Sequence, residues 1–375
     1  MSDLVPWLGW AAFGFFALIT FIQLFYYLYF FRKLAFYKQP EFVEEQQQPV
    51  SVVICARDEA GNLVKNLPGV LFQEYPATHE VILVNDNSTD ETKYVIEEFK
   101  KSFKQINPID LSQEAKLITG KKFPLSMGIK SAKHETILLT DADCVPATEF
   151  WIQKMQSAYV EGKEIVLGYG AYHKKKGFLN KLIRFETFLS ALQYLSFALQ
   201  GLPYMGVGRN LSYKRDVFIR NKGFSSINMI PGGDDDLFIN QVATAENTAI
   251  MIDHEAHTWS EPKKTWSAWM QQKYRHYTTS KYYKPIHKFL LGLFSSSQFL
   301  FYPAMAAAII FHIWWWALIA FGIRLIVQAI IWFNAMKKLN ESDLWPWFLF
   351  FDIWQFFYSL LMFPALFKQP KKTWN

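Results

Sequence analysis

Two aspartates that follow a short apolar segment have the residue types and spacing of a metal site. Thr136–Thr140 is apolar and rich in strand-favouring residues, as expected of a strand covered on both faces. Asp141 and Asp143 follow it, separated only by Ala142. Carboxylates this close repel each other, and a hard divalent cation such as Mg²⁺, held by oxygen ligands, relieves that repulsion. An ordinary strand-end turn, where Asp is common, is the alternative interpretation.

Strands that alternate with helices are expected to position these carboxylates. Ser51–Cys55, Val81–Val84 and Ile106–Leu111 have strand patterns, and Lys122–Ala132 has a helical one. This alternation predicts an α/β fold with a mainly parallel sheet. In such sheets the working site lies beyond the carboxyl ends of the strands. The sequence contains neither the Gly-x-Gly-x-x-Gly turn of dinucleotide folds nor a Gly-x-x-x-x-Gly-Lys phosphate loop.

Apolar segments flank this α/β region on both sides. Leu4–Phe31 contains no Lys, Arg, Asp or Glu and exceeds the ~20 residues that cross a bilayer, so we expect a transmembrane helix over residues 4–31. Arg32 and Lys33 follow it, and the positive-inside rule then places the chain from residue 32 onward in the cytosol. This predicts a multi-pass protein of the inner (plasma) membrane with a cytosolic α/β domain.

The C-terminal apolar region, residues 289–367, is expected to form two or three membrane helices. Phe289–Met336 suits two helices that turn near His312. A third span over Leu344–Phe367 would place the basic tail outside, against the positive-inside rule. This last stretch is therefore either a span or a re-entrant or interfacial segment.

The helical pattern at Gly177–Leu199 has two interpretations. Because charged residues interrupt its apolar pattern, it could lie along the membrane surface as an amphipathic helix. It could equally cover the sheet as a core helix. Ser88 is expected to cap a helix that opens with Asp90 and Glu91, which are favourable residues for a first helical turn.

Net charge and composition limit the classes of partner that the protein is expected to bind. The chain has 375 residues and a formal net charge of +6, which is too small and too scattered to indicate nucleic acid. Basic residues beside apolar segments favour contact with anionic lipid headgroups instead. Cys55 and Cys144 form neither a metal-binding pattern nor a disulfide framework, and we expect buried free thiols in a reducing compartment.

An ordered set of motifs gives the chain a family resemblance. The motifs are CARDE (Cys55–Glu59), VNDNSTD (Val84–Asp90), DAD (Asp141–Asp143), GGDDDL (Gly232–Leu237) and QKYRH (Gln272–His276). In this order they resemble the membrane-bound family 2 glycosyltransferases, which have a GT-A fold. The resemblance covers roughly residues 49–283, within an expected catalytic domain at residues 49–285. It implies transfer of a sugar from a nucleotide-diphosphate sugar, with Mg²⁺ or Mn²⁺ as cofactor.

The resemblance also assigns roles to single residues. Asp143 aligns with the family's metal ligand. The donor-binding positions fall on Ala56, Arg57, Glu59, Asp86, Asp141, Gln272 and Arg275. Arg275 is placed to meet the diphosphate, because a guanidinium makes charge-assisted bonds to phosphate oxygens.

The chain departs from the family pattern at several positions. Asn85 stands where many relatives have an acid, which leaves the choice between uridine and guanosine open, although its amide oxygen can accept a bond from a base. His276 replaces a Trp that stacks on the growing chain in processive relatives, so one or a few transfers are expected. Lys121 and Lys122 are expected to form a solvated basic surface, with contacts to donor phosphates as the alternative.

The catalytic base is expected in GGDDDL. Aligning Asp236 with the end of the family's Glu-Asp-x-Asp-Leu motif places Asp234 on the base and Gly233 where Glu is common. Asp235 is the second candidate, and Asp236 would mainly favour the helix N-terminus.

The resulting hypothesis is an inverting, non-processive glycosyltransferase that acts on a lipid or lipid-linked hydroxyl at the cytosolic membrane face. It has no nucleic-acid partner. The alternatives are a catalytically degenerate scaffold that binds nucleotide sugars and a nucleotidyltransferase, which can share a similar α/β fold.

Overall fold

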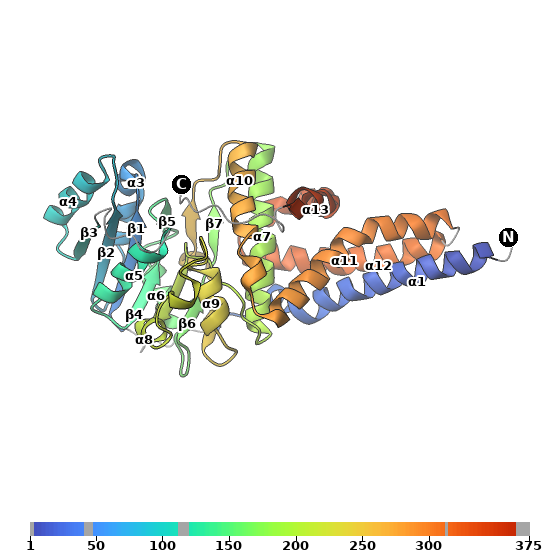
Figure 1. Cartoon of the computed structure of the whole chain (residues 1–375), viewed down its shortest axis with the longest axis horizontal. Helices are drawn as coiled ribbons and strands as arrows, with labels where there is room; N and C mark the ends of the chain where they lie inside the picture. Colours follow the sequence, from blue (N-terminus) through green and yellow to red (C-terminus); the bar gives the residue numbers. More distant parts are fainter. Residues whose placement is uncertain (1–3, 41–47, 112–119, 312–313, 365–375) are drawn as a thin grey trace.

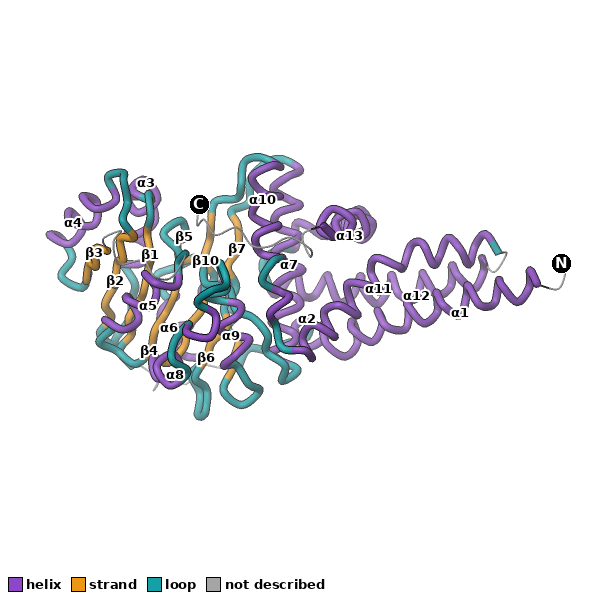
Figure 2. Tube along the Cα trace, in the orientation of Figure 1, coloured by secondary structure: helices purple, strands orange, loops and turns teal. Residues whose placement is uncertain are grey.

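The computed structural model describes residues 4–40, 48–111, 120–311 and 314–364. An α/β domain occupies one end of the molecule, and a bundle of long helices extends away from this domain (Figure 1). All strands of the described chain lie in the α/β part, as the strand colouring in Figure 2 shows.

A seven-stranded sheet forms the centre of the domain, with strand order β3-β2-β1-β4-β8-β6-β9. Its strands are β1 (Val50–Ala56), β2 (His79–Asp86), β3 (Ile106–Leu111), β4 (Thr136–Leu139), β6 (Ile165–Leu167), β8 (Leu211–Lys214) and β9 (Thr248–Ile250). Strand β8 runs antiparallel to its neighbours, β4 and β6, and the other pairs are parallel. The expected mainly parallel α/β fold is therefore confirmed, and β1, β2 and β4 end at one edge of the sheet.

Side chains alternate between two cores on opposite faces of this sheet. In β1, Val53 and Cys55 belong to one core and Val52 and Ile54 to the other, as the twofold side-chain repeat of a strand requires. The helices of the domain are α3 (Ala60–Leu71), α4 (Thr92–Ser102), α5 (Lys122–Ser131), α6 (Trp151–Ser157), α7 (Phe178–Leu199), α8 (Arg215–Arg220), α9 (Asp236–Val242) and α10 (Trp266–Tyr277).

A second, three-stranded sheet brings distant parts of the chain beside the DAD motif. It consists of β5 (Cys144–Pro146), β10 (Thr258–Ser260) and β7 (Gly170–Tyr172), in the order β5-β10-β7. Cys144 pairs with Ser260, and Ser260 pairs with Tyr172. The segment that follows Asp143 is therefore anchored to residues 170–172 and 258–260.

Three helices of the described chain are long and apolar enough to cross a membrane: Trp7–Ala35, α11 (Pro285–Ile310) and α12 (Trp314–Lys338). The first consists of most of α1 (Leu4–Phe25), a π-helical turn (Tyr26–Phe31) and α2 (Arg32–Ala35), so it continues past the expected end at residue 31. The expected turn at His312 lies outside the described residues.

Charged and polar side chains lock this bundle from within. Arg324 on α12 donates to Asp352 Oδ2 at 2.6 Å and to Gln23 Oε1 of α1 at 2.7 Å, and both Arg324 and Asp352 are buried. Tyr302 of α11 also donates to Asp352. Because an unpaired charge is costly among apolar helices, these contacts favour one arrangement of the bundle.

The last apolar stretch does not continue as a third C-terminal spanning helix within the described residues. It forms a 3₁₀ turn (Ser342–Trp347) and the shorter α13 (Phe348–Met362). Figure 1 shows α13 nearly end-on beside α7 and α10, whereas α11 and α12 run across the view. Tyr274 of α10 donates to Leu361 O at 2.9 Å. The helix therefore lies crosswise where the bundle meets the domain, which fits an interfacial segment.

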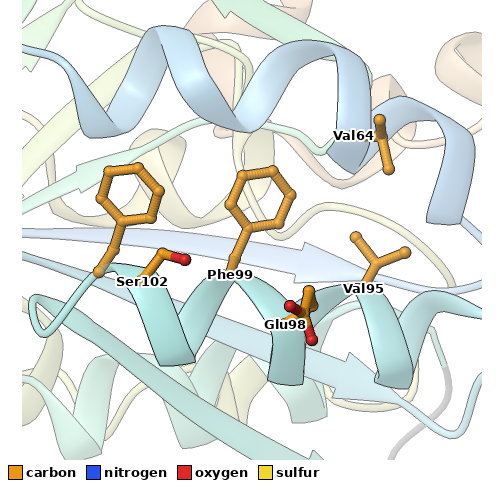
Figure 3. Close-up of a pocket in the computed structure, with 6 residues that line it drawn as sticks. Val64, Val95, Glu98, Phe99 and Ser102 are labelled. Atoms are coloured by element: carbon orange, nitrogen blue, oxygen red, sulfur yellow. The ribbon is translucent and has the colours of Figure 1, made fainter.

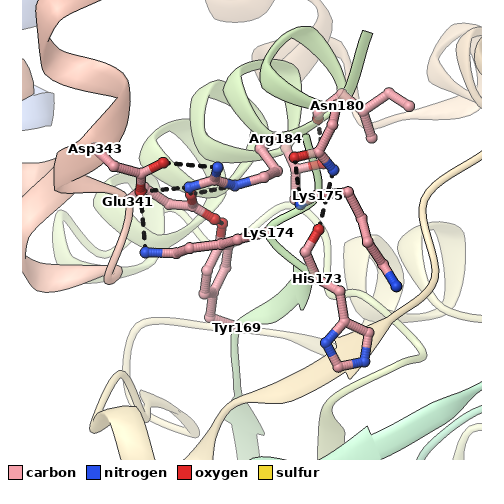
Figure 4. Close-up of polar contacts among 10 residues, drawn as sticks. Tyr169, His173, Lys174, Lys175, Asn180, Arg184, Glu341 and Asp343 are labelled. Atoms are coloured by element: carbon pink, nitrogen blue, oxygen red, sulfur yellow. Dashed lines mark hydrogen bonds and ion pairs between the residues drawn. The ribbon is translucent and has the colours of Figure 1, made fainter. Parts of the chain in front are cut away.

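The sequence allowed two interpretations of α7, a membrane-surface helix or a core helix, and in the structure it is a core helix. Most of its residues are buried, and it packs between β7 and β9 on one side and α2 on the other. Arg184 on α7 donates through Nε to Glu341 Oε2 at 2.9 Å and through Nη1 to Asp343 Oδ2 at 2.8 Å (Figure 4). This cluster joins the domain to the segment between α12 and α13.

Candidate active site

The carboxyl ends of three parallel strands bring most of the candidate residues to one edge of the sheet. Ala56 ends β1, and Asp86, which is fully buried, ends the adjacent β2. Asp141 and Asp143 follow β4, the neighbour of β1 on its other side. The structure therefore assembles the first three motifs at the sheet edge where α/β proteins place their ligands.

Hydrogen bonds tie the loops after β1 and β2 together. Asp58, whose φ is +56°, accepts from Thr89 N at 2.7 Å, and its own N–H donates to Ser88 Oγ at 3.0 Å. The expected helix cap at Ser88 is wrong, because α4 begins only at Thr92 and its N-cap position is Glu91. Ser88 serves to join the two loops.

Asn85, which stands in place of a family acid, is engaged within the protein. Its amide nitrogen donates to Asp110 Oδ1 at 3.0 Å, and its amide oxygen accepts from Ser88 N at 3.2 Å. These contacts fix the loop after β2. The neighbouring Asp86 is thus held at the strand end by a preformed turn.

Glu59 lies on the side of the site that faces the DAD motif. Asn62 donates to Glu59 Oε2 at 2.5 Å. Burial, together with the negative charges of Asp143 and Asp141, raises the pKa of Glu59. The carboxylates from the first loop and from the DAD motif therefore share one electrostatic environment.

Asp141, Asp143 and Cys144 offer ligand atoms that lie within 4.8 Å of one another. Burial and the charge of Asp143 raise the pKa of the Cys144 thiol, whose Sγ lies 2.9 Å from Ser260 Oγ. A protonated thiol is a poor metal ligand, since the thiolate is the binding form. The effective donor set is two carboxylates, which fits a hard divalent cation.

Lys121 forms an ion pair with Asp141, so the expected solvated basic surface is wrong for this residue. Although burial opposes the charged form, the Lys121 ammonium lowers the pKa of Asp141. Lys122 is also buried, and its ammonium donates to Ile227 O at 2.6 Å and to Ile230 O. It supports the segment that leads into GGDDDL. The position of both lysines at the start of α5 was the only sequence signal for these roles.

Two of the three GGDDDL aspartates are held by the fold. Asp235 accepts from Gly208 N at 2.8 Å and from Asp236 N at 2.7 Å, and it is the N-cap of α9. Asp236 accepts from Thr279 Oγ1 at 2.6 Å and from Tyr283 Oη at 2.8 Å. Burial and the neighbouring carboxylates raise the pKa of Asp235 to about 7.

Asp234 has a different environment. Among the described residues, its carboxylate takes part in no hydrogen bond or ion pair, and the side chain is partly exposed. Its charge acts on both Lys121 and Lys122. Asp234 therefore lies within electrostatic range of Lys121, the lysine that pairs with Asp141.

Gly233 stands where the family has Glu for a reason that the backbone makes plain. Its φ is +83°, in the left-handed region that favours glycine, and a Cβ there would lie 2.4 Å from Leu237 Cδ1. A side chain at this position would strain the turn and collide with α9. The turn thus requires glycine directly before Asp234.

Helix α10 carries the QKYRH motif, with Thr265 as its N-cap. Gln272 Nε2 lies 3.5 Å from the Tyr172 hydroxyl, and Arg275 is exposed while its charge helps to lower the pKa of Asp141. Lys273 pairs with Glu186 of α7 and anchors the helix to the domain. The fifth motif therefore faces the DAD aspartates.

The side chains of Arg209 and Tyr172 also lie at the site, although no clear sequence pattern indicates them. The Arg209 guanidinium lies 4.4 Å from the centroid of the Tyr172 ring and donates to Ser260 Oγ at 3.2 Å. Both side chains come from short turns and strands with no distinctive pattern, apart from the glycines of GVGRN.

An apolar cavity between α3 and α4, lined by Val64, Val95 and Phe99, contains none of the candidate residues (Figure 3).

Comparison with known proteins gives a consistent result. Residues 51–221 match the family model "Glycosyl transferase family 2". Over 101 residues the chain is 35% identical to a poly-beta-1,6-N-acetyl-D-glucosamine synthase from Staphylococcus epidermidis, covering 27% of this chain and 23% of that one. Over 101 residues it is 29% identical to a beta-monoglucosyldiacylglycerol synthase from Nostoc sp., covering 27% and 21%. The matched stretches are thus less than a quarter of each relative's length.

A solved structure matches almost the whole fold. The mannosyltransferase from Pyrobaculum calidifontis in complex with GDP-Man and Mn²⁺ superimposes with a TM-score of 0.57 at 16% identity, covering 93% of this chain and 99% of that one. At this identity the likeness concerns the fold, which is of the GT-A type. Residues 51–221, whose motifs gather at one sheet edge, therefore form a domain of the glycosyl transferase family 2 type.

Proposed function

We propose that the protein is an inverting glycosyltransferase that moves a sugar from a nucleotide-diphosphate sugar to the hydroxyl of a lipid or lipid-linked acceptor. The observation that carries this proposal is the convergence of two carboxylate groups on Lys121. The Lys121 ammonium forms an ion pair with Asp141 and also interacts electrostatically with Asp234. A donor site at Asp141 and a proton acceptor at Asp234 would therefore lie next to each other.

The donor would bind along the strand-end edge. Ala56, Arg57, Glu59 and Asp86 would contact the nucleoside. Asp143, beside Asp141, would hold Mg²⁺ or Mn²⁺, which supplies Lewis-acid neutralisation of the diphosphate when bound. Arg275, with Gln272 on the same helix, would contact the diphosphate as it leaves.

Asp234 would act as the general base. Inversion requires a carboxylate to take the proton from the acceptor hydroxyl while the oxygen attacks the sugar carbon. Asp235 and Asp236 already accept hydrogen bonds that hold α9 and its surroundings. The carboxylate of Asp234 accepts none from the described residues, so it is the one available to a substrate.

The position of the site supports a membrane acceptor. Helix α10, which carries Gln272 and Arg275, contacts the crosswise α13 where the domain meets the bundle. A lipid hydroxyl at the membrane surface would therefore be at high local concentration near the donor. The similarity to a beta-monoglucosyldiacylglycerol synthase favours the same acceptor class. His276, in place of the processive Trp, favours one or a few transfers.

The charge distribution supports a cytosolic domain in the inner (plasma) membrane. Arg32 and Lys33 on α2 lie at the end of the bundle nearest the α/β domain, and Lys337 and Lys338 end α12, which packs on α2. Basic residues at this end and none at the start of α12 agree with the positive-inside rule.

A direct test offers detergent-purified full-length protein a panel of UDP- and GDP-sugars with Mg²⁺ or Mn²⁺ and a lipid extract. Release of a nucleoside diphosphate, with a glycosylated lipid of inverted anomeric configuration, is the expected result. Tight donor binding without turnover would instead support a scaffold. Release of pyrophosphate would support a nucleotidyltransferase.

A further inference from the structure

Arg209 is held rigidly beside the DAD motif by groups from two sheets. It lies in the GVGRN turn before β8, and its carbonyl oxygen accepts from Thr140 Oγ1 and Thr258 Oγ1, both at 3.0 Å. The adjacent Gly208 N–H donates to Asp235. The backbone of this residue is therefore fixed between the end of β4 and the cap of α9.

The side chain of Arg209 occupies a place shaped for it. Its guanidinium lies over the Tyr172 ring at 4.4 Å, a cation–π contact. A Cβ at Gly170 would come within 3.1 Å of Arg209 Cβ and 3.3 Å of its Nε. Glycine at 170 therefore leaves the room through which the side chain passes, and any larger residue would crowd it.

The guanidinium faces negative charge that it does not neutralise by direct contact. Although burial opposes the charged form, the negative charges of Asp143 and Asp141 help to raise the pKa of Arg209. Among the described residues it forms no ion pair, and its one hydrogen bond to a side chain goes to Ser260 Oγ. By contrast, Lys121 is paired with Asp141. Several guanidinium N–H donors are therefore open to a ligand.

We propose that Arg209 binds the diphosphate of the donor from the side of the second sheet. The inference rests on the proposed function, because it names a further contact to that donor. A diphosphate held at Asp143 would bring phosphate oxygens next to the guanidinium, whose planar fork suits them. The sugar and the nucleobase offer no such charge.

Tyr172 acts as a positioning residue in this arrangement. Its ring supports the guanidinium of Arg209, and its hydroxyl lies 3.5 Å from Gln272 Nε2. One tyrosine thus connects Arg209 to the helix that carries Arg275. The two arginines approach the DAD motif from different elements, and both charges act on Asp141.

The test compares nucleotide affinities of full-length variants by calorimetry in detergent with Mn²⁺. The probes are the nucleoside diphosphate that the wild type releases and the corresponding nucleoside. Arg209→Ala should weaken diphosphate binding by about 10–100-fold, the range for a lost charged hydrogen bond, and leave nucleoside binding within about twofold. Arg209→Lys should lose less, because it keeps the charge but not the fork. The matched control is Arg220→Ala, on the exposed face of α8.

Other outcomes would contradict this role in different ways. Equal loss of nucleoside and diphosphate binding in both Arg209 variants would mean a structural role and overturn the assignment. An unchanged diphosphate affinity with a raised acceptor KM would place Arg209 on the acceptor side and also overturn it. A wild type that binds no nucleoside diphosphate would overturn the proposed function together with this inference.

Discussion

Three consecutive aspartates show how neighbouring residues of one type acquire different roles. Asp235 accepts two backbone N–H groups, and Asp236 accepts two hydroxyls, so both carboxylates are committed to the fold. Asp234 is partly exposed and, within the described chain, accepts none. The charge of Asp234 acts on Lys121, whose ammonium pairs with Asp141.

Asp234→Asn is expected to lower kcat by about 10²–10⁴-fold, the usual contribution of a positioned general base. Donor KM should stay nearly unchanged, because the residues proposed to bind the donor are retained. Steady-state kinetics with the identified donor measures both. Asp235→Asn is the comparison: it should lower the melting temperature, since it alters the cap of α9. Wild-type turnover in Asp234→Asn with loss in a stable Asp235→Asn would move the base by one residue.

Asp143→Ala is expected to abolish turnover, because the donor's diphosphate charge would lose its counter-ion. EDTA should do the same to the wild type, and added Mg²⁺ or Mn²⁺ should restore activity. The measurement is nucleotide release after exhaustive dialysis. Cys144→Ser serves as the control, since its neutral thiol is not expected to bind the metal. Full activity in EDTA would contradict the metal assignment.

At the level of secondary-structure elements, two buried ionisable residues support the domain that carries the site: Arg184 on α7 and His257 before β10. Helix α7 carries Arg184, which is 2% exposed and bonds to Glu341, which is 0% exposed, and to Asp343 (Figure 4). Strand β10 is preceded by the buried His257, whose Nε2 lies 3.2 Å from Ile252 O. Both are buried ionisable groups, so their contributions to stability depend on partners and on pH.

Arg184→Ala should destabilise the protein by about 3–5 kcal/mol, the typical cost of leaving one member of a buried ion pair without its partner. Here the carboxylate left behind is that of Glu341. Thermal unfolding in detergent, followed by tryptophan fluorescence, measures the effect. Asp343→Asn should cost less, because the Asp343 side chain is 45% exposed. Equal melting temperatures for wild type and Arg184→Ala would refute a joining role for this cluster.

The lowered pKa of the buried His257 predicts that the protein loses stability at acidic pH. Burial, together with the nearby charge of His254, lowers the pKa of His257 to about 3. Between that value and about 6.5 the unfolded chain therefore binds more protons, so stability falls as the pH falls through this window. Unfolding free energies from pH 7 to pH 4 should show this slope for wild type and for the exposed-site variant His254→Gln. The slope should be shallower in His257→Asn; an identical slope there would argue against the assignment.

The whole molecule places an α/β domain at one end of a membrane-capable bundle. The three long apolar helices put the basic ends of α2 and α12 on the side of the domain. The buried Arg324–Asp352 pair keeps α13 attached across the bundle. This arrangement holds α10, with two of the candidate donor-binding residues, where the domain meets the bundle.

Reporter fusions test the orientation. A reporter after Lys38 should be active as a cytosolic fusion, and one after Phe311, between α11 and α12, should be active only outside. This follows from the basic residues that end α2 and α12. A Lys38 fusion that is active only on the outer side would reverse the proposed topology. The Phe311 fusion serves as the internal comparison.

Local patterns in the sequence determined the fold class and the order of the motifs. The strand patterns Ser51–Cys55, Val81–Val84 and Thr136–Thr140, like the long apolar flanks, can be recognised within a few residues, because side-chain periodicity and bilayer length are local properties. The family match and the GT-A-type fold agree with that prediction.

Only the tertiary structure decided which of these residues stand together. The pairing of Lys121 with Asp141, the place of Arg209 over Tyr172 and the burial of α7 all join segments distant in the chain. The same holds for the difference between Asp234 and Asp235, which depends on the N–H of Gly208. No local pattern encodes such contacts, because a side chain's charge and exposure are set by the neighbours that folding brings to it.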